Sequence, residues 1–88
     1  MEEFLEKSLE MRGMKRIEIV NYFISISGKV VDNEKILGEG WQAEIEQEKL
    51  VVIGSLKIPA TIVLLRCRKE LLQQMLVDFR LRFLSAGG

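Results

Sequence analysis

The 88-residue sequence contains no histidine and only one cysteine, Cys67. A single thiol cannot form an internal disulfide, and this usage is typical of proteins from a reducing compartment. Zinc and transition-metal sites draw most of their ligands from histidine and cysteine, so the composition argues against a metal centre. The absence of histidine also excludes a Cys–His catalytic pair. We expect Cys67 to be structural and the protein to need no cofactor.

The sequence also lacks net charge, a long apolar run and a rich set of aromatic residues. Its 13 basic side chains balance 13 acidic ones, whereas nucleic-acid-binding domains are usually strongly basic. Aromatic residues make up 7% and do not alternate with basic ones as stacking platforms do. The longest apolar run, IPATIVLL, is too short to span a bilayer, and the acidic start MEEFLEKSLE does not resemble a signal peptide. We expect a cytoplasmic protein that binds neither nucleic acid nor membrane.

The length and the apolar content predict one small domain, residues 1–88. Apolar residues make up 48% and charged residues 30%, which is ordinary for a soluble globular protein. A chain of this size buries only a little over ~60% of its unfolded surface. Its stability is therefore modest unless a partner covers more of it.

Two segments have helical periodicity. In residues 14–28, Ile17, Val20 and Ile24 form one apolar row and Ile19, Phe23 and Ile26 another, and Gly28 follows at a position suited to a left-handed C-cap. The β-branched content of this segment also permits a strand, but a strand here would be apolar on both faces. Residues 69–86 predict the clearest helix, with a single apolar side made of Leu72, Met75, Leu76, Phe79 and Phe83.

The rest of the chain reads as strands. Residues 41–46 alternate apolar and polar side chains, which predicts a half-buried strand. Residues 49–59 predict a second strand with a bulge or bend at Gly54-Ser55, and residues 60–68 a central strand with Pro59 at its entrance. Residues 28–37 predict one more strand with a bend or turn at Asp32-Asn33. Residues 3–12 suit a strand better than a helix.

These elements predict an α+β domain of two layers, in the order β-α-β-β-β-β-α, with one antiparallel sheet and both helices on one face. That order is the arrangement of the TATA-binding-protein-like fold. The stretches LGEGWQAEIEQ and LKIPATIVLLRCRKELLQQMLVDFRLRFLSAGG resemble the C-terminal domain of proteins related to the small subunit of molybdopterin synthase. The resemblance implies an association with molybdenum-cofactor biosynthesis. It brings no catalytic motif. The ubiquitin-like half that precedes this domain in the family has no counterpart in this sequence, so we expect either a stand-alone version of the domain or a second polypeptide that carries the rest.

The C-terminal Gly87-Gly88 allows two interpretations. In ubiquitin-like carriers a terminal Gly-Gly carries the carboxylate that is activated for sulfur or acyl transfer. Here the pair follows a long amphipathic helix after only Ser85 and Ala86, so it also fits a helix C-cap with Gly87 in the left-handed position. We favour the cap and keep the carrier tail as the alternative.

Basic residues at the junction of the last strand and the last helix are the best candidates for ligand contact. Arg66, Arg68 and Lys69 stand near free helix N–H groups, an arrangement that can hold a phosphate or carboxylate. On a strand, Arg66 and Arg68 point away from Cys67, so they are not expected to activate its thiol. Arg80 and Arg82 lie farther along the helix and need not belong to the same patch. A solvated basic surface is the plain alternative.

With both helices on one side, the other side of the sheet should be polar, but residues 50–53 and 61–65 are apolar on both faces. Contiguous bare apolar surface on a small protein usually marks an interface. No residue set forms an active site. We therefore expect a non-enzymatic binding module that forms a homodimer or docks a protein partner of cofactor biosynthesis.

The same pattern predicts that the protein is not a compact monomer at micromolar concentration. Sedimentation over a wide concentration range should show a species heavier than 10.1 kDa. A single 10.1 kDa species throughout would contradict a homodimer and favour a separate partner.

Overall fold

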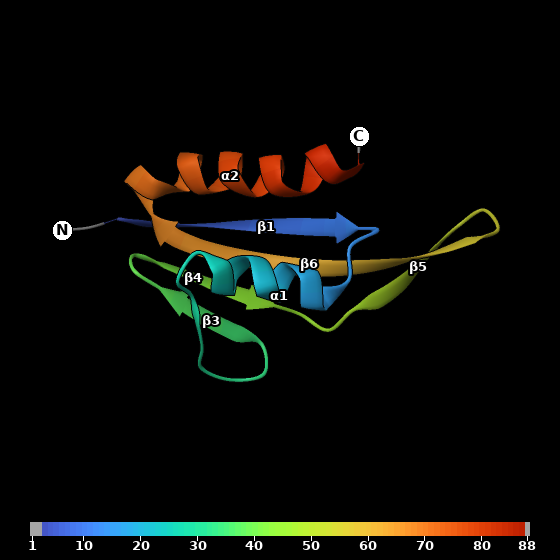
Figure 1. Ribbon diagram of the computed structural model, residues 1–88, viewed down its shortest axis with the longest axis horizontal. Helices are drawn as coiled ribbons and strands as arrows, with labels where there is room; N and C mark the ends of the chain where they lie inside the picture. Colours follow the sequence, from blue (N-terminus) through green and yellow to red (C-terminus); the bar gives the residue numbers. More distant parts are fainter. Residues whose placement is uncertain (1–2, 88) are drawn as a thin grey trace.

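The computed structural model describes residues 3–87 and shows an α+β domain (Figure 1). Six strands and two helices follow one another as β1 (Phe4–Arg12), α1 (Arg16–Ser25), β2 (Lys29–Val30), β3 (Lys35–Gly38), β4 (Trp41–Ile45), β5 (Lys49–Ile53), β6 (Leu56–Arg68) and α2 (Lys69–Gly87). The predicted class, the antiparallel sheet and the two helices are confirmed. The strand preferred for residues 3–12 and the helix preferred for residues 14–28 are also present.

The open sheet is organised around β6, its longest strand. The strand order is β1-β6-β4-β3-β2, and every pairing is antiparallel. One edge of β6 pairs with β1 from Phe4↔Arg68 to Arg12↔Ala60. The other edge pairs first with β5 and then with β4, so β4 and β5 behave as one strand interrupted at residues 46–48.

Both helices pack on the same face of this sheet, as predicted. The side chains that point from β4 and from residues 61–67 of β6 toward the helices are almost fully buried, whereas their neighbours along the strands, apart from Ala60, are not. This alternation with period two is that of a sheet covered on one side only. The buried core consists of Ile19, Tyr22, Phe23, Ile36, Trp41, Ala43, Ile45, Val63, Leu65, Cys67, Leu76, Phe79 and Phe83.

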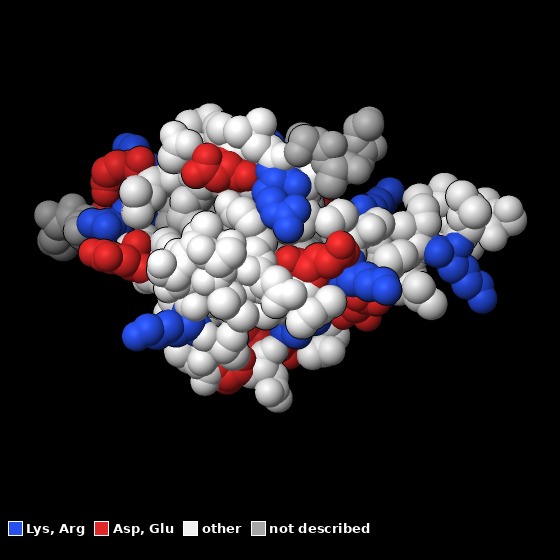
Figure 2. Space-filling model, in the orientation of Figure 1, with Lys and Arg blue, Asp and Glu red and all other residues white. Residues whose placement is uncertain are grey.

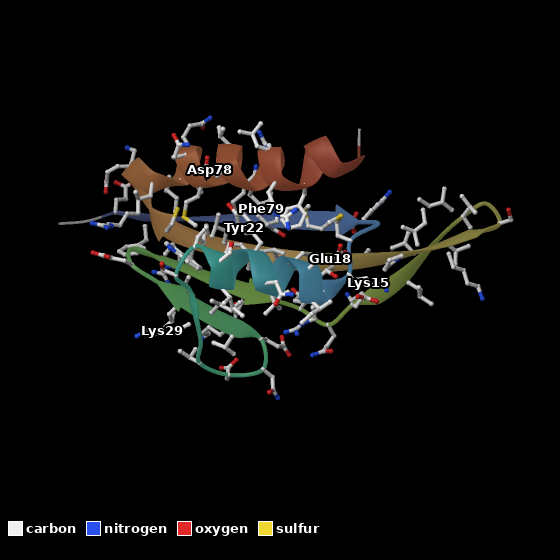
Figure 3. All side chains as sticks on the ribbon, viewed as in Figure 1. Lys15, Glu18, Tyr22, Lys29, Asp78 and Phe79 are labelled. Atoms are coloured by element: carbon white, nitrogen blue, oxygen red, sulfur yellow. The ribbon has the colours of Figure 1, made fainter. Side chains whose placement is uncertain are left out.

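An aromatic cluster joins the two helices. The ring of Tyr22 on α1 meets those of Phe79 and Phe83 on α2 edge-on, with centroids 5.4 and 5.6 Å apart. Phe23 stacks on Phe79 at 5.6 Å and contacts Trp41 of β4 at 5.4 Å. Figure 3 shows Tyr22 and Phe79 next to one another between the helices. Offset and edge-on ring pairs add about 0.5–1.5 kcal/mol each beyond the area that they bury.

Helix α1 buries a different face from the one that its isoleucines suggest. Ile19, Tyr22 and Phe23 are buried, whereas Ile17 and Ile24 are exposed. Of the two apolar rows, Ile19 and Phe23 enter the core and Val20 packs against it, so the apolar stripe predicted for this helix is only partly buried. Apolar spacing alone could not separate two adjacent rows on one helix, and Tyr22 enters the core because its ring meets α2.

The two ends of α1 are closed by hydrogen bonds. At the start, the Glu18 carboxylate accepts a hydrogen bond of 3.0 Å from the backbone N–H of Lys15; Figure 3 labels both residues. At the end, the N–H groups of Ser27 and Gly28 donate to the carbonyls of Ile24 and Phe23, which is the Schellman pattern. The left-handed residue is Ser27, with φ 74°, so the prediction that Gly28 takes this role is wrong.

Gly28 is required for a different reason. A Cβ atom there would lie 2.5 Å from the Phe23 carbonyl oxygen and 2.8 Å from the Trp41 ring. The glycine therefore lets the chain pass close against the end of α1 on its way to β2.

Two chain reversals were predicted only in part. The single strand expected at residues 28–37 is a hairpin of β2 and β3, in which the Asp32 carboxylate accepts hydrogen bonds from the N–H groups of Glu34 and Lys35, each 2.9 Å long. The turn at Asp32-Asn33 is thus confirmed. Gly54-Ser55 is no bulge within a strand but the tip of the β5–β6 hairpin, with Gly54 at φ 61°.

Pro59 lies inside β6, not at its entrance. On one side it pairs with Leu50 of β5. On the other side it has no partner residue in β1, because the β1–β6 pairing ends at Arg12↔Ala60. Its carbonyl accepts a hydrogen bond of 2.7 Å from Gly13 N–H, which closes the sheet at the end of β1.

The β5–β6 hairpin projects beyond the body of the domain (Figure 1). We call residues 49–59 the arm. The projection makes the molecule elongated, with extents of 49 × 28 × 21 Å and a radius of gyration of 13.4 Å. A compact domain of this length has a radius of gyration of about 12 Å.

Helix α2 continues through Gly87. The expectation that Gly87 is the left-handed residue after the helix is therefore wrong, and the last turn of the helix includes it. Gly88 lies outside the described residues. The apolar face of α2 is as predicted, since Leu76, Phe79 and Phe83 are buried.

We predict that Phe79→Ala and Phe83→Ala each lower the free energy of unfolding by about 3–5 kcal/mol, because each leaves a cavity in the aromatic cluster. Urea denaturation followed by circular dichroism measures the loss. The control is Gln73→Ala, at an exposed position of the same helix. Unchanged stability in both phenylalanine variants would contradict the packing of α2 described above.

Candidate binding surface

The sheet face opposite the helices has no covering layer among residues 3–87. The strand register defines its side chains, because residues paired in an antiparallel sheet point to the same side. Polar, charged and apolar groups mix on it: Phe4, Glu6, Ser8 and Glu10 from β1, Ile62, Leu64 and Arg66 from β6, Gln42 and Glu44 from β4, and Lys35 and Leu37 from β3. We call this surface the open face.

A shallow pocket lies at one corner of the open face. Its volume is about 320 Å³, and it is lined by Phe4, Leu37, Gly38, Gly40, Trp41, Gln42 and Arg66. The Arg66 guanidinium stands over the Phe4 ring, 5.7 Å from its centroid, an arrangement in which the ring holds the cation in place. Phe4 and Leu37 are both exposed at its rim. The pocket therefore offers apolar surface beside one cation and one amide.

The three predicted ligand-binding residues occupy neighbouring but different positions. Arg66 is exposed on the open face, and Arg68 is half-buried beside Gly40, to whose carbonyl its backbone N–H donates a hydrogen bond of 3.0 Å. Lys69 begins α2, but its N–H donates to the Glu3 carbonyl at 2.8 Å. This first N–H of the helix is therefore occupied, and of the three residues only Arg66 lines the corner pocket.

Arg80 and Arg82 lie apart from that corner. They come 11 and 13 residues after Lys69 on α2, which corresponds to about 16–20 Å along a helix. Arg80 borders a second pocket of about 320 Å³ between α2 and β1, whose wall is mainly apolar. Arg82 lies over the Phe83 ring at 5.6 Å. The five basic residues form no single patch.

Figure 2 shows acidic and basic side chains interspersed over the body of the molecule on the side seen in Figure 1. On the arm, by contrast, white atoms predominate, and its charged residues are Lys49 and Lys57. Charge is therefore distributed around the body and is scarce on the arm.

The Cys67 side chain points to the helix side, opposite its neighbours Arg66 and Arg68, and is fully buried. Burial raises the pKa of the Cys67 thiol above its ordinary value of 9.0, and the carboxylate of Glu70 adds to the effect. The thiolate is thus disfavoured, as a structural cysteine requires. Burial also raises the pKa of Tyr22 above 10.0, helped by Asp78 and opposed by Arg82.

Arg16 is an important residue that the sequence did not reveal. Its guanidinium donates hydrogen bonds to the carbonyl oxygens of Ile45, Asn33 and Glu46, and its backbone N–H donates to the Glu48 carboxylate at 2.9 Å. The side chain therefore ties the start of α1 to the β2–β3 turn and to the interruption between β4 and β5. Nothing in the local sequence marks Arg16, because the partners of its guanidinium are backbone carbonyls 17 to 30 residues away along the chain.

Within residues 3–87 no cluster of three or more acidic or cysteine side chains could hold a metal ion. Neither of the described helices is long and apolar enough to cross a membrane.

The family comparison agrees with this picture. A family model described as archaeal MoaD-like protein matches residues 7–88. The chain is thus a small α+β domain of the MoaD-like type, and it belongs to the archaeal MoaD-like family. The resemblance to proteins related to the small subunit of molybdopterin synthase is confirmed by this match. No curated protein matches the chain.

The raised pKa values predict that the protein loses stability at alkaline pH. The folded state keeps the Cys67 and Tyr22 protons to higher pH than the unfolded state, so stability is at its full value below the ordinary thiol pKa of 9.0 and declines as the pH rises above it. Melting temperatures on both sides of that pH measure the decline. Cys67→Ala should show a shallower decline than the parent, and equal slopes would contradict the role of the thiol.

Proposed function

We propose that this protein is a non-enzymatic binding module that supports molybdenum-cofactor biosynthesis in the cytoplasm. Membership of the archaeal MoaD-like family links it to the small subunit of molybdopterin synthase. The observation that supports a binding role best is the open face, a sheet surface on which exposed Phe4 and Leu37 stand beside charged groups. Apolar surface with a charged rim is characteristic of protein interfaces.

The corner pocket is the most specific part of this surface. Arginine and aromatic residues are over-represented among the residues that dominate binding energy at interfaces. Arg66 over Phe4 provides both in one place, with Leu37 beside them. The matching partner surface would present an apolar side chain next to a carboxylate, because the arginine would then pair with an anion at the edge of the apolar contact.

We also propose that the fold is TATA-binding-protein-like. What supports this assignment is the element order: because β4 and β5 pair with the same edge of β6, they count as one interrupted strand. The chain then reads β-α-β-β-β-β-α, with both helices on one face. A fold of this kind does not itself define a function.

The alternative is a sulfur or acyl carrier that acts through Gly87 and Gly88. A carrier tail must reach into an activating enzyme as an extended chain, whereas α2 extends through Gly87. The helical state of Gly87 supports the binding module over the carrier.

One set of variants separates the two functions in a strain that depends on this protein. A binding module predicts that Arg66→Glu lowers the molybdopterin content of the cells, because it reverses the charge of the corner pocket. It also predicts that deletion of Gly87 and Gly88, or Gly88→Ala, changes the content little. The control is Arg80→Glu, which reverses an exposed charge on α2 and should have no effect.

The carrier predicts the opposite pattern. Deletion of Gly87 and Gly88 would then abolish the activity with unchanged circular dichroism, and Arg66→Glu would be tolerated. That result would overturn the binding module.

A further inference from the structure

Strands β1, β2 and β5 each have one edge without a partner strand within residues 3–87, and residues 56–59 at the start of β6 have no partner strand on the side away from β5. An unpaired edge exposes backbone N–H and C=O groups to which another strand can bind. Natural proteins protect such edges by charged side chains, by proline or by keeping the edge strand very short. The start of β6 contains Lys57 and Pro59 and is protected by them. The edges of β1, β2 and β5 differ sharply in these respects.

The edges of β1 and β2 are also protected. Strand β1 carries charged side chains at Glu6, Lys7, Glu10 and Arg12, and an ion pair of 2.7 Å joins Arg12 to Glu10. Strand β2 is only two residues long, Lys29 and Val30. Both therefore resist pairing with a second chain.

The edge of β5 is the least protected, because its one charged residue, Lys49, stands at its very start. After Lys49 it consists of Leu50, Val51, Val52 and Ile53, with no charge and no proline. Leu50 is 66% exposed and Val52 64% exposed. Opposite Ile53 on β6, Leu56 at the tip of the arm is 62% exposed, so the exposed apolar surface extends over both strands of the arm.

The chain exposes more surface than expected for a monomer of its mass, by about the area that one partner contributes to an interface. A compact monomer of 10.1 kDa is expected to expose about 5300 Å², whereas this chain exposes 6033 Å². The excess of roughly 700 Å² over that expectation is close to the ~800 Å² that one partner contributes to an interface of standard size. The arm contributes to this exposed surface with Leu50, Val52, Ile53 and Leu56, which are 45–66% exposed.

We propose that a second copy of this chain binds to the arm, with the β5 strands of the two copies pairing antiparallel about a two-fold axis at Val51. This proposal specifies the interface and the partner of the binding module described above, and it rests on that function. In this register Val51 faces Val51, Leu50 faces Val52, and Lys49 faces Ile53 of the second copy.

The sequence of β5 suits pairing with itself. Its apolar core, Leu-Val-Val-Ile, presents aliphatic side chains in either direction, so in an antiparallel copy Leu50, Val51 and Val52 each meet an aliphatic residue, and Ile53 meets Lys49. The two lysines do not oppose each other, and cross-strand pairs of aliphatic β-formers stabilise a sheet. Centring on Val51 is also the register in which all five residues of β5 have partners.

The geometry has a consequence for the open faces. In the proposed pair of β5 strands, odd-numbered residues face odd-numbered ones and even-numbered residues face even-numbered ones. Facing residues point to the same side, so both copies direct their helices to one side of a continuous sheet. Their open faces then lie side by side on the other side. A dimer would offer two corner pockets to a partner on one surface.

Sedimentation of the parent and of two lysine variants tests the proposal. The parent should sediment at twice 10.1 kDa at micromolar concentration, and Val52→Lys should sediment as a 10.1 kDa monomer, because its charge lies on the pairing edge. The matched control is Val30→Lys on β2, where the valine is 56% exposed and the variant should remain dimeric. Circular dichroism establishes that both variants are folded.

Hydrogen exchange of the unsubstituted protein gives a second measurement that needs no variant. The outward amides of β5 should become more protected as the protein concentration rises, because they are hydrogen-bonded only in the dimer. The amides of β1 should not respond.

A monomeric parent, or a dimer that Val52→Lys leaves intact, would overturn the arm as the interface. Either result would leave the binding module itself untouched, since that is tested by the effect of Arg66→Glu on molybdopterin content. If Arg66→Glu has no effect while Val52→Lys still dissociates the dimer, the proposed function fails and the dimer stands.

Discussion

The contact between Tyr22 of α1 and the phenylalanines of α2 determines the layout of this protein. Tyr22, Phe79 and Phe83 can meet only if both helices lie on the same face of the sheet. Phe23 and Trp41 then connect this pair of helices to β4. Both helices lie in one layer, and residues 3–87 contain no further helix that could cover the other face. The open face and its corner pocket are therefore direct results of how the core is packed.

The sequence predicted well those elements whose pattern is local. The five apolar positions of α2 follow a single helical stripe, and Trp41, Ala43 and Ile45 alternate cleanly with polar neighbours, so type and buried side were both evident. Gly54-Ser55 was harder, because a bulge and a tight reversal use the same residues, and only the pairing of β5 with β6 separates them. Ser27 was missed because the left-handed position after a helix is usually occupied by glycine. Here the glycine is needed one residue later, at position 28, where a Cβ atom would collide with the Phe23 carbonyl and the Trp41 ring.

The candidate site shows the same division. The alternation of Arg66, Cys67 and Arg68 on a strand predicted that the two arginines turn away from the buried thiol. The corner pocket could not be predicted, because Phe4, Leu37 and Arg66 come from strands that meet only in the folded sheet. The hydrogen bonds of the Arg16 guanidinium to distant backbone carbonyls likewise form only in the folded protein. By holding the carbonyls of Ile45 and Glu46, it secures the interruption after which β5 leaves the body, and it thereby sets where the arm begins.

The position of β6 at the centre of the sheet also has a consequence for how the protein folds. Its pairing with β5 closes across a two-residue turn, but its pairing with β1 joins residues from Arg12↔Ala60 to Phe4↔Arg68, which are 48 to 64 positions apart in the chain. Contacts of such long range are slow to form, because the entropy of closing the loop is lost before the contacts contribute. The topology therefore implies that the arm is assembled early and that β1 is the strand that completes the sheet last. Until β1 pairs, the edge of β6 that it covers stays exposed during folding. The N-terminal segment of the chain is therefore needed to complete the sheet.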